Sequence, residues 1–271
     1  MNAFHYEAVC LMALIAAALD KESDSRFYAF EAERVKKQFN SLLLDSKKRY
    51  YKDGIDTDHN SLHANMLPMA FGMVPGKYIK SVTEFIKSRK MACSVYGSQF
   101  LLDAIYNAHE AEYGLQLLSS TKERSWYNMI RAGSTITMES WDNKYKPNQD
   151  WNHAWGAVPA NIIPRKLMGI EPIEPGYRKI RIKPQPGTLQ QASIRIPTVR
   201  GDVSVAFNNV PGTRFEINVE VPANSTAEIW LPALSSNNKV QINDTLRKGI
   251  REDKFVKILI GSGSHNLVVG K

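Results

Sequence analysis

Glu139 and His153 lie fourteen residues apart in a segment that also holds Trp141, Trp151 and Trp155. The whole chain has five tryptophans, so three of them gather here. A carboxylate can accept a proton or activate a water, and indole rings stack on the apolar faces of a sugar ring. This combination is typical of a sugar-hydrolysing pocket. Glu139 is therefore our candidate catalytic residue, and the histidine and the three tryptophans are candidates for substrate binding.

Each of these assignments has a plainer alternative. Glu139 could be a surface residue of a loop, and His153 could be a structural residue at the start of a helix. A buried indole needs a partner for its N–H and brings a large apolar area, so at least one of the three tryptophans is expected to pack against the protein. We expect Trp155 to do so, because it opens a helical segment. The closeness of the groups in sequence nevertheless favours a pocket.

A second polar cluster occupies residues 53–65. Asp56, Asp58 and Asn60 resemble the first ligands of a calcium-binding loop. However, Ser61 stands where the turn glycine is required, and Leu67 stands where the bidentate glutamate is required. The calcium-loop interpretation therefore fails.

The histidines of this cluster do not complete a metal site either. His59 and His63 are four residues apart, as in a zinc-binding helix, but Asn60 follows the first of them where glutamate is required, and no third ligand is evident. We predict no metal and a pocket-lining loop, with His63 pointing inward to the substrate and Asp58 or Asn60 capping the next helix. Tyr96 is a further candidate for substrate binding, with a core anchor as the alternative.

Up to about residue 168 the apolar residues recur at helical spacing. Positions 4, 8, 11, 15 and 19 predict a first helix, whose apolar run over 8–19 is typical of a core helix, and positions 27 to 39 predict a second with Asp24 near its N-cap. Further helices are predicted at 60–74, 77–88, 95–109, 122–131 and 153–167, with connections that contain Gly54, Gly76, Gly114 and Gly133. The pattern predicts a succession of helical hairpins.

Around residues 172–177 the period changes from helical to alternating. Two prolines in this segment stop a helix. Beyond it, apolar residues alternate with polar ones near 180–182, 194–196, 203–207, 215–221, 229–231 and 256–260, with turn residues between. This pattern predicts an antiparallel β-sandwich. We therefore predict a multi-domain α and β protein, with a helical domain at 1–172 and the sandwich at 173–271.

The net charge of +8 does not indicate a nucleic-acid partner. Its excess falls mostly in residues 173–271, which hold 14 Lys and Arg against 8 Asp and Glu. Residues such as Arg178, Lys179 and Arg181 lie along predicted strands, and no nucleic-acid motif accompanies them. We interpret them as a solvated basic face and predict no nucleic-acid partner.

Neither the cysteines nor the apolar segments place the chain in a compartment. Cys10 and Cys93 lie in apolar helical patterns and are expected to be buried free thiols rather than a disulfide. The apolar run at 8–19 is too short to span a bilayer, and residues 1–7 contain no Lys or Arg. We therefore predict neither a transmembrane helix nor a signal peptide in this chain, and no membrane partner.

Several motifs follow one another in an order that characterises one glycosidase family. They are SLHAN at 61–65 with GMVP at 72–75, GSTITMESW at 133–141, NHAWG at 152–156, and GIEP at 169–172 with GY at 176–177. Together they resemble the bacterial α-L-rhamnosidases of glycoside hydrolase family 78. TVRGDVSV at 198–205, VPANST at 221–226 and WLP at 230–232 resemble the β-sandwich that follows the catalytic barrel in that family.

The resemblance implies a partial α/α barrel of the six-hairpin type followed by an antiparallel β-sandwich. It also implies hydrolysis, with inversion and without a cofactor, of terminal α-L-rhamnose in a rhamnose-containing oligosaccharide or glycoside. The GSTITMESW motif corresponds to the family motif that carries the general base, which assigns this role to Glu139. The family's His-Ala-Trp motif assigns a pocket position to His153.

The chain also departs from the family pattern. The general acid of the family lies in an acidic motif upstream of the region that this chain resembles, and no such motif is evident between Met1 and Glu139. The predicted helices are too few to close a barrel. We therefore expect the C-terminal part of such an enzyme, with little or no turnover by itself. Its open helical edge should expose apolar surface and favour association.

Two other classes of function stay open at this point. A non-catalytic carbohydrate-binding or scaffold chain could use the tryptophans without an acid and base pair. Another α/α-barrel glycosidase or a polysaccharide lyase could share the fold. A lyase pairs its base with a cation that neutralises a uronate carboxylate, and the sequence shows no cluster of Arg or Lys beside Glu139.

Overall fold

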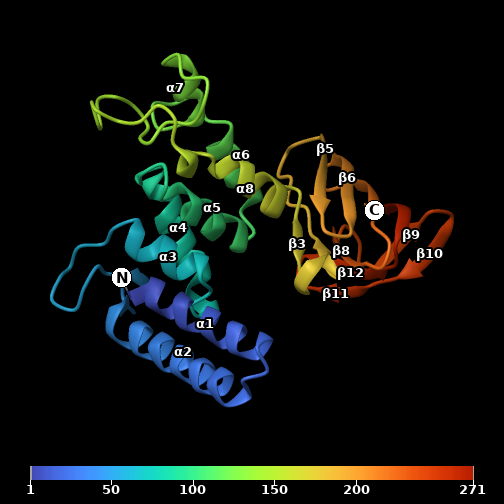
Figure 1. Ribbon diagram of the computed structural model, residues 1–271, viewed down its shortest axis with the longest axis horizontal. Coiled ribbons are helices and arrows are strands. Elements are labelled where there is room, and N and C mark those ends of the chain that lie inside the picture. The colour runs from blue at the N-terminus through green and yellow to red at the C-terminus, as the bar shows by residue number, and fades with distance from the viewer. Residues whose placement is uncertain (1, 271) are drawn as a thin grey trace. The chain divides into compact units, whose positions relative to one another are not determined.

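The computed structural model describes residues 2–270, which form two compact units. The first unit comprises residues up to 108 together with 121–156, and the second comprises 109–120 and the chain from 157 onward. Figure 1 shows helices at the blue and green end of the chain and strands at the orange and red end. The helical turns just before residue 172 belong to the same unit as the strands. The end of the catalytic domain at residue 172 stays a prediction.

The first unit begins with a long helical hairpin of α1 (Asn2–Ala18) and α2 (Glu22–Leu43). Small residues such as Ala16 and Ala32 are buried. The apolar stripe that predicted a core helix is instead exposed: Leu11, Ile15 and Leu19 are 48%, 52% and 62% exposed. The expectation of a buried helix was therefore wrong, whereas the expected apolar surface is present. Asp24 lies inside the first turn of α2 rather than at its cap.

Shorter elements complete the first unit. They are β1 (Leu44–Asp45), β2 (Tyr50–Tyr51), α3 (His63–Ala70), α4 (Ile79–Arg89), α5 (Ser98–Asn107) and α7 (Trp126–Arg131), with 3-10 turns at Gly76–Tyr78 and Ala154–Gly156. Helix α5 is the most deeply buried, and its Leu101, Leu102 and Ile105 have no exposed surface. The helical hairpins confirm the predicted class of domain, and within residues 2–270 they do not close a barrel (Figure 1).

The helical part of the second unit contains one helix that the sequence pattern missed. This unit holds α6 (Ala111–Leu118), α8 (Val158–Ile162) and a π-helical turn at Ile163–Leu167. Gly114 was assigned to a connection, but it is buried inside α6. Glycine is a poor helix former, and here the burial of one helix face outweighs that preference.

The strands of the second unit form two sheets with one covered face each. Strands β3 (Ile170–Pro172), β4 (Lys179–Ile182), β8 (Thr226–Pro232), β11 (Ile250–Glu252) and β12 (Phe255–Ile260) form one sheet in the order β11-β12-β8-β4-β3. Strands β5 (Gln191–Thr198), β6 (Gly201–Val210), β7 (Arg214–Val221), β9 (Lys239–Ile242), β10 (Thr245–Lys248) and β13 (Gly263–Gly270) form the other in the order β10-β9-β13-β7-β6-β5. Alternate residues are buried, as the sequence period predicts. One pair, β4 with β8, is parallel, and the other strand pairs are antiparallel.

The structure shows the partners of the basic residues and the state of the two cysteines. The Lys179 Nζ lies 2.6 Å from Glu228 Oε1, and Arg181 Nη1 lies 3.4 Å from Glu171 Oε2, so acidic side chains balance both charges. Both cysteines are free, as expected. Cys93 is buried, which raises its pKa to about 12, whereas Cys10 is only half-buried, so the expectation of a buried thiol was wrong for Cys10. Among residues 2–270, no helix combines the length and the apolar character needed to cross a bilayer.

Candidate active site

The candidate site lies on the segment that follows α7, where two stretches of backbone run beside each other. The N–H of Glu139 donates to Asp150 O at 2.9 Å, and the N–H of His153 donates to Thr137 O at 2.9 Å. The Thr137 hydroxyl returns a 2.9 Å hydrogen bond to His153 O. These bonds bring the predicted base and the predicted histidine together, although fourteen residues separate them in sequence.

Gly156 allows this close approach. A β-carbon added at this position would lie 2.7 Å from both Met138 O and Thr137 Cβ, which is closer than real side chains come. Any larger residue would therefore push the two stretches apart. Ser125 starts the preceding helix by accepting a hydrogen bond from the Asn128 N–H.

Both oxygens of the Glu139 carboxylate accept hydrogen bonds. Oε1 accepts from the Lys146 ammonium, and Oε2 accepts from the Asp150 N–H at 3.2 Å. The side chain is 13% exposed. The hydrogen bond from Lys146 is the main cause of a lowered pKa for Glu139, and the Asp150 N–H lowers it further. The carboxylate is therefore held in its ionised form, as a general base requires.

His153 and Trp155 form the side of the site next to this carboxylate. Their ring centroids lie 4.1 Å apart, and the indole N–H of Trp155 donates to Glu139 O at 3.2 Å. The Tyr96 ring lies 5.6 Å from that indole. Trp155 is 44% exposed, and Tyr96 is 48% exposed. The carboxylate thus has an imidazole and exposed aromatic rings around it.

The other two tryptophans differ from each other in burial. Trp141 is 3% exposed, its indole N–H donates to Cys93 O at 2.8 Å, and its ring lies 5.1 Å from that of Trp126. Trp151 is 40% exposed. The expectation that Trp155 is the packing tryptophan was therefore wrong, because Trp141 takes this role and has almost no surface left for a ligand.

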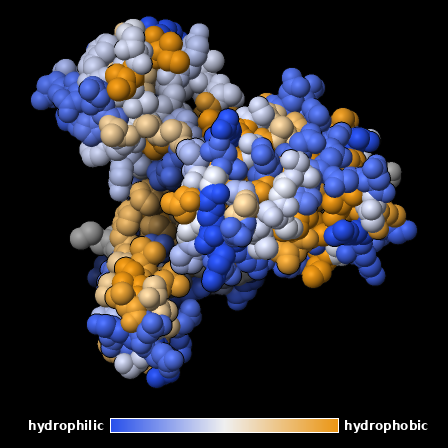
Figure 2. Space-filling view, turned by 45° about the vertical axis from the view of Figure 1, so that its right-hand side comes forward, coloured by the Kyte–Doolittle hydropathy of each residue, from blue (hydrophilic) through white to orange (hydrophobic). Residues whose placement is uncertain are grey.

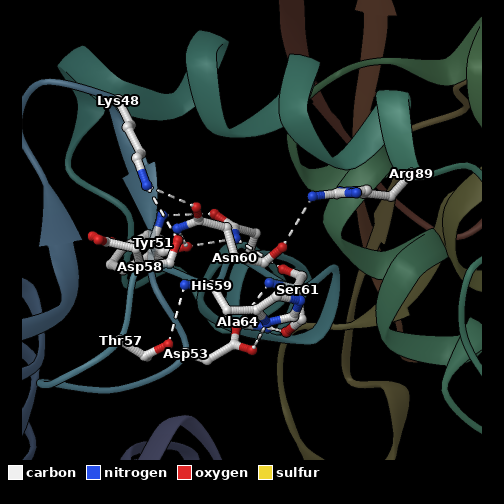
Figure 3. Close-up of polar contacts among 11 residues, drawn as sticks. Lys48, Tyr51, Asp53, Thr57, Asp58, His59, Asn60, Ser61, Ala64 and Arg89 are labelled. Atoms are coloured by element: carbon white, nitrogen blue, oxygen red, sulfur yellow. Dashed lines mark hydrogen bonds and ion pairs between the residues drawn. The ribbon is translucent and has the colours of Figure 1, made fainter.

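The 53–65 cluster forms a hydrogen-bonded loop (Figure 3). Asp53 accepts from the Ser61 N–H at 2.8 Å and lies 2.5 Å from the His59 Nδ1. The buried Asn60 accepts from Lys48 at 3.2 Å and donates to Tyr51 O at 3.0 Å. These hydrogen bonds, within the cluster and to Lys48 and Tyr51 just before it, give a structural reason for the presence of Asp53, Asn60 and Ser61.

One detail of this loop differs from the sequence prediction, and another stays open. The Ser61 hydroxyl, rather than Asp58 or Asn60, accepts the 3.1 Å hydrogen bond from Ala64 N–H at the start of α3. His63 is exposed at the first position of that helix, and its direction toward a substrate stays a prediction. No contact recorded within residues 2–270 joins His63 to the carboxylate of Glu139.

One group of side chains could in principle offer ligand atoms to an ion. Glu139, Asp150 and His153 each provide one such atom, and these atoms lie within 4.8 Å of one another. The Lys146 ammonium already contacts the Glu139 carboxylate and balances its charge. An ion would have to displace this cation, so the arrangement gives no reason to assign a metal.

Lys146 and Asp150 are the site residues that sequence reasoning missed. Both lie in the connection between Glu139 and His153, which has no periodic pattern that would indicate their direction. The sequence showed no cluster of Arg or Lys beside Glu139, but in the structure one cation, Lys146, contacts this residue. The cation is paired with the proposed base itself and so differs from the free cation that a lyase requires.

Two family domains match this arrangement of helices and strands. Residues 1–167 match the bacterial alpha-L-rhamnosidase 6 hairpin glycosidase domain, and residues 169–245 match the bacterial alpha-L-rhamnosidase C-terminal domain. The helical residues thus belong to the class of six-hairpin glycosidase domains. The chain belongs to the bacterial α-L-rhamnosidase family.

Known relatives agree with this membership. An alpha-L-rhamnosidase of Streptomyces avermitilis is 26% identical over 99% of this chain, and one of Alteromonas sp. is 26% identical over 86% of it. The structure of the Streptomyces avermitilis enzyme complexed with L-rhamnose aligns with a TM-score of 0.80 at 25% identity over 99% of this chain. The rhamnosidase structure from Dictyoglumus thermophilum aligns with a TM-score of 0.85 at 24% identity over 99% of this chain, which supports the fold.

The matches cover only part of the relatives. The chain spans 26% of both curated enzymes and 26% and 31% of the two solved chains. The activity of a whole relative therefore cannot be assigned directly to this chain.

Proposed function

We propose that this chain supplies the general base and part of the sugar-binding wall of an α-L-rhamnosidase that acts with inversion. The observation that carries the proposal is the ionised Glu139 carboxylate, which is held from both oxygens beside His153 and the exposed Trp155. In this role Glu139 removes a proton from the water that attacks the anomeric carbon. The similar Streptomyces avermitilis enzyme, which was crystallised with L-rhamnose, supports rhamnose as the sugar.

We further propose that the general acid comes from outside the described residues. The two carboxyl groups of an inverting glycosidase lie about 6.5–9.5 Å apart, so that a water fits between the base and the sugar. Asp150 is too close to Glu139 for this role, because their oxygens lie within 4.8 Å of each other. Asp150 also lies 3.4 Å from the His153 Nδ1. A carboxylic acid from another helical segment would complete the pair.

The apolar face of the first hairpin is the proposed contact for such a segment. Leu14 on α1 and Phe30 on α2 are 66% and 68% exposed, and further apolar residues of both helices are also exposed. Figure 2 shows apolar residues gathered over the lower left of the molecule, above a hydrophilic rim. A helix that is apolar on most sides is normally buried. We therefore propose that helical hairpins of the complete enzyme cover this face.

An assay of the 271-residue chain on an aryl α-L-rhamnoside tests this proposal. We expect little or no turnover, because the base is present and the acid is not. Turnover at the level of a complete enzyme would contradict the assignment of the acid to another segment. Product release would then have to depend on an acid within this chain.

A carbohydrate-binding role without catalysis is the second candidate. The exposed aromatic rings of Trp155 and Tyr96 favour it, since they offer stacking surface without any acid. Calorimetry with L-rhamnose, run beside the hydrolysis assay on a complete enzyme, separates the two. Binding with hydrolysis supports the glycosidase, and binding without hydrolysis supports the second candidate.

A further inference from the structure

The connection between Glu139 and Asp150 folds back so that one of its lysines reaches the proposed base. Lys146 donates to Oε1 of Glu139, while the backbone N–H at the end of the same connection donates to Oε2. Two donors on two different oxygens fix both the position and the rotation of a carboxylate. Each carboxylate oxygen has two acceptor sites, so one donor on each leaves capacity for a water.

The connection does not need Lys146 to keep its shape. Gln149 is 7% exposed, and its Oε1 accepts from the Ser140 N–H at 2.8 Å and from the Ser140 hydroxyl at 3.1 Å. Asn128, on α7, donates to Trp141 O at 3.0 Å and to Asp142 Oδ2 at 2.9 Å. Lys146 is 43% exposed at its side chain, and exposed ion pairs contribute little to stability. The structural role of this lysine is therefore small.

We propose that Lys146 is a positioning residue that clamps the Glu139 carboxylate in the orientation needed to accept a proton. The inference rests on the proposed base role of Glu139 and adds a residue to it. Lys146 has no place in the motifs that identify the family, since it lies in the connection between them.

The charges around Glu139 explain why a clamp is useful. The groups that face it are Lys146, Asp150 and His153. A second carboxylate close by favours protonation of the first, whereas a cation in contact favours ionisation. Lys146 is the largest cause of the lowered pKa of Glu139. Its removal should therefore raise that pKa, and the base would be lost at a higher pH as the solution is acidified.

A titration of the Glu139 side chain by carbon NMR on the full chain tests this inference without any need for turnover. The Glu139 carboxyl signal is assigned by its loss in Glu139→Gln. In Lys146→Met we expect the titration midpoint of Glu139 to move upward, toward the ordinary value of a glutamate, while the Asp150 N–H still holds it below that value. Lys146→Arg keeps a cation and should retain the low midpoint. Lys146→Gln is a second neutral variant and should reproduce the shift.

Lys144→Met is the matched control. Lys144 lies in the same connection, is 54% exposed at its side chain and pairs with another carboxylate, that of Glu123. Its removal changes the net charge equally and should leave the Glu139 midpoint unchanged. An unchanged midpoint in both neutral Lys146 variants would overturn the inference, as would an equal shift in Lys144→Met. If Glu139 is not the base, Glu139→Gln in the complete enzyme would keep full turnover. This readout is separate from the titration.

Discussion

Replacing Glu139 by glutamine in the complete enzyme is expected to lower kcat by roughly 10²–10⁴-fold, which is the usual contribution of a general base. Glutamine has almost the same shape, and its single carbonyl oxygen can still accept from one of the two donors, Lys146 or the Asp150 N–H. It cannot take a proton from water. The effect should therefore fall on kcat, while the affinity for substrate is retained.

Glu123→Gln is the control for this substitution. The Glu123 carboxylate also contacts a lysine, Lys144, and its pKa is also lowered, mainly by the hydrogen bond from that lysine. It is not part of the Glu139, His153 and Trp155 group. We expect hydrolysis at the unsubstituted rate. A loss of equal size in both variants would mean that the ion pairs of this region, rather than one base, support activity.

The second large effect is expected at Gly169, between the π-helical turn and β3. Gly169 has a φ of +77°, and an added β-carbon would lie 2.1 Å from the backbone C and O of Lys183. The two residues are also joined by a 3.0 Å hydrogen bond from Lys183 N to Gly169 O. Alanine would therefore meet an unfavourable φ, at about 1–2 kcal/mol, and a backbone collision, at about 1–3 kcal/mol.

We expect Gly169→Ala to lower the free energy of unfolding by about 2–5 kcal/mol. Gly212→Ala separates the two causes, because Gly212 has a similar φ of +71° but nothing within 4 Å of an added β-carbon. This control should lose only about 1–2 kcal/mol. Chemical unfolding followed by circular dichroism gives both values. Equal decreases in the free energy of unfolding in the two variants would show that the backbone of Lys183 does not destabilise Gly169→Ala.

The sequence predicted the parts of the fold that depend on local periodicity. The alternation of Val203, Val205 and Phe207 corresponds to inward positions of β6, and helical spacing indicated most helices of the first unit. Strands β9, β10, β11 and β13 were not predicted, since they are short or rich in polar residues. Helix α6 was missed because glycine was taken as a turn signal.

The burial of aromatic residues could not be predicted from spacing alone. Trp141 is covered because its indole N–H reaches Cys93 O, 48 residues earlier in the chain. The exposure of the apolar residues of α1 could not be predicted either, since a pattern of apolar residues does not reveal which segment covers them. The nearness of Glu139 to His153 was predicted from their closeness in sequence, and both lie in the same connection between α7 and the turn at Ala154–Gly156. Lys146 was not predictable, because side-chain direction in a loop follows no period.

The central claim is that Glu139, His153 and Trp155 face one sugar. The most direct measurement is NMR of the unsubstituted chain during titration with L-rhamnose, which has no glycosidic bond and therefore binds without turnover. We predict saturable shifts at the His153 ring and at the Trp155 indole N–H, with those of the buried Trp141 unchanged. Shifts that are confined to other residues, or no shift at saturating sugar, would contradict the account.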